Sequence, residues 1–129
     1  MNYQLPKTER LHAEKSIKEL FNEGSSFFLF PFKVLFFVKK GTPSGTRQVL
    51  FSVPKRKLKK AVDRNFVKRR MKEAYRLNKD LLSLENIEFN LGLIYVSGNL
   101  MEFSEIQPKI TLCLKKLQIL LSEKHRQHE

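Results

Sequence analysis

The chain has 129 residues, of which 41% are hydrophobic, and its 25 Lys and Arg against 13 Asp and Glu give a net charge of +12. This length fits one domain, and the apolar content is enough for a packed core, which excludes a wholly disordered chain. A domain this basic repels itself unless it binds a polyanion, usually nucleic acid or an anionic membrane. We therefore predict a single domain over residues 1–129 with a polyanionic partner.

Several features bear on the compartment. The longest apolar stretch, residues 27–38, is interrupted by Pro31 and Lys33 and is too short to span a bilayer. Charged residues stand at positions 9, 10 and 14, where a secretion signal would need an apolar core. The single Cys113 has no partner for an internal disulfide. These features predict a cytoplasmic protein without membrane association.

The first predicted element is a short helix over residues 13–23. Ile17, Leu20 and Phe21 stand at helical spacing within it and give it one apolar face. Gly24 follows directly and is typical of the end of a helix. We expect this helix to pack through that face.

Two strands are predicted next, over residues 32–39 and 48–53. The first is rich in phenylalanine and valine, and the second is followed by Pro54. Residues 40–46 between them hold the glycine, proline, serine and threonine that are typical of a hairpin loop.

A helix, a strand and a second helix are predicted in the remainder of the chain. Residues 59–78 are charged and free of proline and glycine, whereas residues 89–96 have aromatic and β-branched residues on both faces, as a central strand does. The last helix is predicted from Ser104, whose spacing to Gln107 resembles a capping box. Its apolar face contains Ile106, Ile110, Cys113, Leu117 and Leu120. The order α-β-β-α-β-α predicts an α+β fold, a two-layer sandwich of helices over a small sheet.

The helix predicted at 59–78 separates its charges from its apolar residues. Residues 55–76 contain eleven Lys or Arg against two acids. At 100° per residue, one arc of the helix holds Arg64, Asn65, Lys68, Arg69, Lys72 and Arg76. A separate arc holds Val67, Met71 and Ala74 and is suited to packing on the sheet. Like charges at i+4 repel by about 0.2–0.5 kcal/mol per pair, so we expect phosphate oxygens to compensate them.

A run of charge on a helix is more often a solvated face. Here the acids that normally alternate with the bases are missing, which favours a nucleic-acid surface, with RNA and DNA both open at this point. Lys55, Arg56 and Lys57 follow the second strand. They are either a phosphate clamp or a solubilising loop.

Eleven phenylalanines are many for a chain of this length, and six of them lie within residues 27–37. Strand alternation sends Phe32, Val34 and Phe36 to one face of the sheet, and Lys33, Leu35 and Phe37 to the other. The simple interpretation is core packing. The alternative is a platform on which single-stranded bases stack.

No catalytic or metal-binding constellation is apparent in the sequence. His12, His125 and His128 lack neighbours at the spacing that a zinc site needs, and Cys113 lies between leucines as a buried apolar residue would. The acids are too scattered for a two-metal nuclease. We predict that the side chains of this protein do not carry out bond cleavage.

Residues 51–76 read FSVPKRKLKKAVDRNFVKRRMKEAYR. This segment closely resembles the signature of the bacterial ribonuclease P protein component: a strand ending in Ser-Val, a Lys-rich turn, and then Ala-Val-x-Arg-Asn-Arg-x-Lys-Arg. Arg10, Leu11 and residues 21–24 also resemble the opening of that family.

The resemblance implies a function in tRNA maturation. Proteins of this family join a large catalytic RNA, and the complex removes the 5′ leader from precursor tRNA. The resemblance implies that Mg²⁺ ions serve the complex and are held mainly by the RNA, with none assigned to the protein. It also implies a left-handed β-α-β crossover that contains the basic helix, against the usual right-handed rule.

Two sets of site residues follow from the resemblance. The residues that match RNA-binding positions are Lys55, Arg56, Arg64, Asn65, Lys68, Arg69 and Lys72. The precursor leader is expected in a cleft between the first helix and the sheet, lined by Ile17, Phe21, Val34 and Phe36. A shift of one residue in the strand alignment would bring in Leu35 instead.

The chain departs from the family pattern at two positions. Phe66 stands where the third motif residue is usually Arg, and it either packs against a neighbouring helix or stacks where the Arg would have met phosphate. Ile17 stands where an aromatic is common, so apolar contact would replace stacking there.

Two other functions remain open. A ribosomal or assembly-type RNA binder would carry the same charge pattern without any part in processing. A protein-only nuclease would cleave RNA alone, and the lack of clustered acids argues against it.

Overall fold

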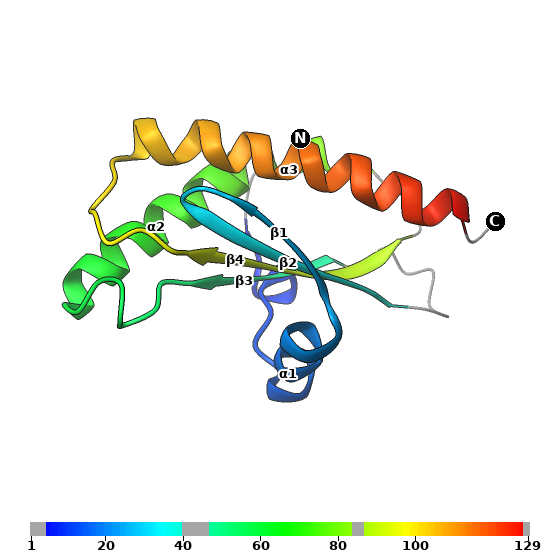
Figure 1. Cartoon of the computed structure of the whole chain (residues 1–129), viewed down its shortest axis with the longest axis horizontal. Helices are drawn as coiled ribbons and strands as arrows, with labels where there is room; N and C mark the ends of the chain where they lie inside the picture. The colour runs from blue at the N-terminus through cyan, green and yellow to red at the C-terminus, as the bar shows by residue number, and fades with distance from the viewer. Residues whose placement is uncertain (1–4, 40–46, 84–86, 128–129) are drawn as a thin grey trace.

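The computed structural model describes residues 5–39, 47–83 and 87–127, with the side chains of 124–127 left out (Figure 1). The predicted hairpin loop at 40–46 and His128 lie outside these residues, and the side chain of His125 is not described. The helices are η1 (Lys7–Glu9), α1 (Glu14–Glu23), α2 (Ala61–Asn78), η2 (Lys79–Leu81) and α3 (Phe103–Gln127). The strands are β1 (Ser25–Leu29), β2 (Phe32–Lys39), β3 (Arg47–Ser52) and β4 (Glu88–Tyr95). The α+β class is confirmed.

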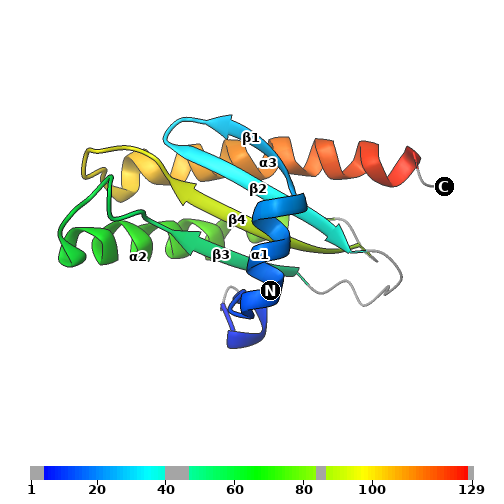
Figure 2. The ribbon, with the colours of Figure 1, turned by 60° about the horizontal axis from the view of Figure 1, so that its bottom comes forward.

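The four strands form one sheet in the order β1-β2-β4-β3. β2 pairs antiparallel with β1 and β4, whereas β3 and β4 are parallel and are joined through α2. In Figure 2 both of these strands point the same way, with α2 behind the sheet and β4 above β3. This arrangement makes the crossover left-handed, as the resemblance implied.

Helices cover the two faces of the sheet unequally. α2 and α3 pack side by side on one face, and α1 alone crosses the other (Figures 1 and 2). The face under α2 and α3 carries the main core, which includes Phe32, Val34 and Phe36. The face under α1 carries a smaller cluster of Leu11, Leu20, Leu35 and Ile94. Among the described residues, the helix on this second face is α1, which crosses only part of it (Figure 2).

Gly92 sets how closely α1 lies on the sheet. A Cβ at this position would stand 3.2 Å from Leu20 Cδ2 and 3.5 Å from Leu35 Cβ, so the missing side chain leaves the space that Leu20 fills. Leu20 is fully buried there. Because a glycine sits at this point of β4, α1 contacts the sheet directly.

Three expectations about the elements need correction. The sequence predicted no separate strand before residue 32, but β1 pairs with β2 over residues 25–29. α2 begins at Ala61 and not at 59, because Lys60 has extended backbone with ψ 129°. α3 begins at Phe103, and Ile106 N–H donates to Glu102 O at 3.0 Å, so Ser104 lies inside the helix and not at its cap.

Candidate functional site

The cationic arc of α2 lies on the outside of the molecule. We call Arg64, Asn65, Lys68, Arg69 and Lys72 the basic face. The opposite side of the helix buries Val67, Met71, Ala74 and Tyr75 in the main core. Within the basic face, Asn65 and Arg69 are exposed, and the other three are half-buried. Core packing therefore fixes the rotation of α2 and turns the basic face to solvent.

Arg64 has a second role at the start of α2. Its Nη1 donates to Leu58 O at 3.0 Å and to Lys59 O at 2.7 Å. These bonds tie the helix to the turn before it, where Lys55 and Arg56 are exposed. The turn and the helix thus present their cations as one surface.

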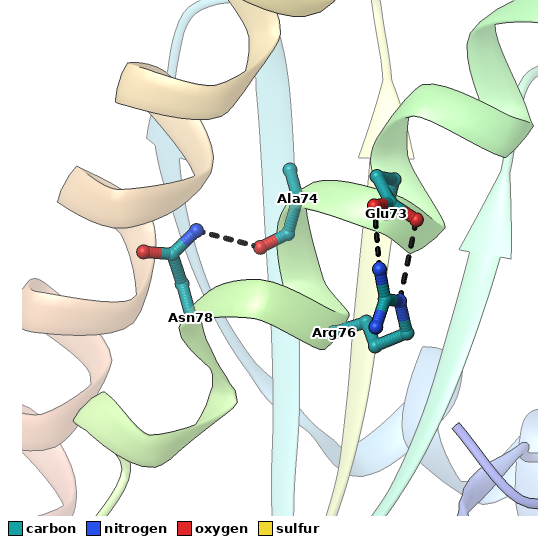
Figure 3. A network of polar contacts seen from close by, with 4 residues as sticks. All are labelled: Glu73, Ala74, Arg76 and Asn78. Carbon is teal, nitrogen blue, oxygen red and sulfur yellow. Dashed lines mark hydrogen bonds and ion pairs between the residues drawn. The ribbon is translucent and has the colours of Figure 1, made fainter. Parts of the chain in front are cut away.

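The sequence places few acids near the basic face, and the ion pairs of the described residues do not involve it. On α2, Arg76 donates to Glu73 through Nη2 at 2.5 Å and through Nε at 3.2 Å, while Asn78 Nδ2 donates to Ala74 O at 2.8 Å (Figure 3). Within residues 5–39, 47–83 and 87–127, none of the ion pairs includes a member of the basic face. Glu73 therefore neutralises Arg76 at the end of the arc and leaves the rest available for phosphate.

A groove beside the basic face is lined by further cationic side chains. It has a volume of about 380 Å³, and Lys7 and Arg10 line it together with Lys68 and Lys72. Its apolar lining includes Val49 and Leu50 of β3. Burial, and then the nearby charges of Lys68 and Arg10, lower the pKa of Lys72. Convergence of like charges without an acid is the electrostatic pattern of a phosphate-binding site.

Lys7 and Arg10 were not among the predicted site residues. They lie more than 50 residues before α2 in sequence, and contacts with the outer edge of β3 bring them to the groove: Leu11 N–H donates to Val49 O at 2.9 Å. Lys79 Nζ pairs with Glu9 Oε2 at 3.1 Å and fastens the same segment to the end of α2. The resemblance of Arg10 to the family's opening was the one available signal.

The predicted cleft residues fall on two different faces of the sheet. Ile17 is half-buried and Phe21 is 50% exposed, both on α1. Val34 and Phe36, however, are buried in the main core under α2 and α3, so the strand phase assigned to them is wrong. Leu35, the alternative, lies on the α1 face and packs with Ile17 and Leu20.

Phe66 packs against the core, which agrees with the first of its two expected roles, and it also has an intrahelical contact that was not expected. It is half-buried against the main core. The guanidinium of Arg70, one turn later, stands 3.7 Å from the centre of its ring. Phe66 therefore stabilises α2 through apolar packing and a cation–π contact, and it leaves no cation at the third motif position.

The described residues offer little for protein-based chemistry. No three His, Cys, Asp or Glu side chains gather into a metal site in the described ranges. Cys113 is fully buried, and burial raises the pKa of its thiol to about 12, which removes it as a nucleophile. None of the helices in the part of the chain that the structure describes has the length and apolarity to cross a membrane.

Comparisons with known proteins agree on one family. The family model described as Ribonuclease P matches residues 5–118. A ribonuclease P protein component from Geobacter sp. strain M21 is 37% identical over 114 residues, covering 88% of this chain and 91% of the relative. Another from Porphyromonas gingivalis is 34% identical over 109 residues, covering 81% and 80%.

Solved structures of such proteins share the fold. The RNase P protein from Thermotoga maritima superposes with a TM-score of 0.67 at 25% identity, covering 84% of this chain and 96% of that one. The protein from Staphylococcus aureus gives a TM-score of 0.66 at 22% identity, covering 86% and 96%.

Proposed function

Because this chain belongs to the family of ribonuclease P protein components, we propose that it binds the catalytic RNA and the 5′ leader of precursor tRNA. In this way it promotes endonucleolytic removal of the leader during tRNA 5′ maturation. The observation that carries the proposal is the basic face, whose side chains are exposed or half-buried along α2 and have no carboxylate partners among the described residues. An RNA backbone would supply the missing counter-charge.

In this proposal, two surfaces of the protein bind two different RNAs. Lys55, Arg56 and the basic face bind phosphates of the catalytic RNA. The α1 face of the sheet binds the leader, with Ile17 and Phe21 supplying apolar contact to unpaired bases, while Leu35 is buried and packs behind Ile17. The cations of the protein reduce repulsion between the two RNAs, which lets the leader approach the catalytic RNA.

The bond-breaking chemistry belongs to the RNA in this proposal. The proposal places the Mg²⁺ of the complex mainly on the RNA subunit, as the family resemblance implies. The protein's contribution is binding and orientation of the substrate in the cytoplasm.

The direct test is leader removal by the reconstituted complex. At low Mg²⁺, the RNA subunit alone is expected to cleave precursor tRNA slowly, and addition of this protein is expected to accelerate cleavage strongly. The measurement is the rate of 5′-leader release on a gel. Protein without RNA serves as the control, and cleavage in that control would indicate a protein-only nuclease. RNA binding without acceleration would indicate a ribosomal or assembly-type binder instead.

A second test isolates leader contact. Replacement of Phe21 by alanine removes a half-exposed ring at the α1 face and leaves the basic face untouched. We expect affinity for precursor tRNA to fall about fivefold or more, as loss of a stacked or apolar base contact does. Affinity for mature tRNA, which lacks the leader, should not change. Equal losses for the two RNAs would reject a leader site next to α1.

A further inference from the structure

Phe28, in β1, and Phe30, in the turn that follows, are two phenylalanines whose side chains face solvent. The side chains of Phe28 and Phe30 are 60% and 53% exposed. Their ring centroids are 6.4 Å apart, with 55° between the ring planes. A tilted pair of this kind leaves ring surface open to a third flat group. Exposed rings side by side are a cost to a soluble protein unless they bind something.

The pairing of the strands places Phe28 in a row that crosses the sheet. Phe28 is opposite Lys33, Lys33 is opposite Ile94, and Ile94 is opposite Ser52. The next row contains Leu35 and Gly92, against which Leu20 of α1 packs. Since side chains two residues apart point to the same face, Phe28 and Lys33 lie on the α1 face, one row beyond the helix.

Helix geometry predicts that Phe21 points from α1 toward this row. Figure 2 shows α1 crossing the strands from β3 toward β1. Leu20 points at the sheet, and the next residue of a right-handed helix is rotated by 100° about the helix axis. With α1 running in this direction, that rotation turns Phe21 toward the end of the sheet at which β1 joins β2. The turn that carries Phe30 is at this end. We therefore expect Phe21 to face the same end of the sheet as the Phe28–Phe30 pair.

We propose that Phe28 and Phe30, with Lys33 beside them, form a second base-stacking subsite that takes an unpaired leader nucleotide beyond those held next to α1. The inference rests on the proposed function, which it extends to the outer edge of the sheet.

Charge decides between RNA and protein as the occupant. Lys33 is exposed, and none of the ion pairs in the described ranges includes it. A flat aromatic surface next to a free ammonium group matches a nucleotide, because the base stacks on the ring while the phosphate pairs with the cation. Lysine is depleted at the centre of protein–protein interfaces, which disfavours a second protein on this row.

The test uses the reconstituted complex and precursor tRNAs whose leaders are lengthened one nucleotide at a time. The double variant Phe28→Leu, Phe30→Leu keeps apolar bulk and removes both aromatic rings. We expect it to bind precursors with long leaders about fivefold more weakly than the wild type, as loss of base stacking does. Binding of mature tRNA and of precursors with the shortest leaders should be unchanged. The single variant Phe28→Tyr, which keeps the ring and leaves Phe30 in place, should bind long leaders as tightly as the wild type.

A spectroscopic measurement locates the contact. 2-Aminopurine placed at successive leader positions should lose fluorescence on binding at one distal position, and this loss should disappear in the double leucine variant. Lys33→Gln should flatten the salt dependence by about 0.7 in log–log slope, the value of one phosphate contact on a single strand.

Three results would overturn the subsite. They are an effect independent of leader length, no effect at any length, and unchanged RNA binding with loss of self-association of the free protein. The proposed function is tested separately in the same precursors by Phe21→Ala. A defect for Phe21→Ala without one for the double leucine variant would reject the subsite and leave the function standing.

Discussion

Replacement of Lys68 and Arg69 together by alanine is expected to weaken binding to the catalytic RNA and to flatten its salt dependence. Each phosphate contact that is lost lowers the log–log slope by about 0.7 to 0.9, so the double variant should lose about 1.5. Neither residue pairs with a carboxylate within the described residues, so no acid is left unpaired. Alanine also favours helix, so α2 should remain intact. The measurement is a titration of RNA binding at several salt concentrations.

Lys115→Ala provides the matched control for this variant. Lys115 is exposed and also lies on a helix, α3, but outside the basic face. Its replacement changes the net charge by one without removing a predicted RNA contact. If Lys115→Ala flattened the slope as much per charge as the double variant does, general attraction would explain RNA binding, and α2 would have no special part in it.

Replacement of Leu20 by alanine is expected to destabilise the protein strongly. Leu20 is fully buried between α1 and the sheet, where it fills the space above Gly92. A cavity there should lower the free energy of unfolding by about 2–5 kcal/mol, as for other buried leucines. Urea unfolding followed by circular dichroism measures the change.

The adjacent Phe21 provides the comparison for Leu20. Because its side chain is 50% exposed, Phe21→Ala should cost roughly 1 kcal/mol or less in the same experiment. The two neighbours on α1 thus separate stability from leader binding. Similar losses of stability for both would show that α1 does not depend on Leu20 for its position on the sheet.

The basic face was predictable because its signal is local. Val67 and Met71 share one arc of α2 while Lys68 and Lys72 share another, and a regular helix keeps these arcs apart. The sequence also placed Leu20 correctly on the apolar face of α1. Periodicity within one element was sufficient in both cases.

The phase of β2 was not predictable from its own residues. Both faces of this strand are apolar, because Val34 packs under α2 and α3 while Leu35 packs under α1. Alternation shows which residues share a face but not which layer that face meets. Only the tertiary arrangement places Leu35 next to α1.

Two further features depend on contacts between distant segments. β1 is short, and its exposed Phe28 departs from the usual burial of apolar residues. In the sequence, its phenylalanines therefore cannot be distinguished from those of β2. Arg10 reaches the groove through its bridge to Val49, which no local pattern indicates.

The bridge between Arg10 and Val49 also has a consequence for solubility. β3 is an outer strand of the sheet, and an outer strand with free backbone groups can pair with the same strand of another molecule and start aggregation. The Leu11 N–H occupies one of those groups, the carbonyl of Val49. The segment that brings cations to the groove therefore also covers part of the outer edge of β3 and hinders strand-to-strand association between copies of this chain.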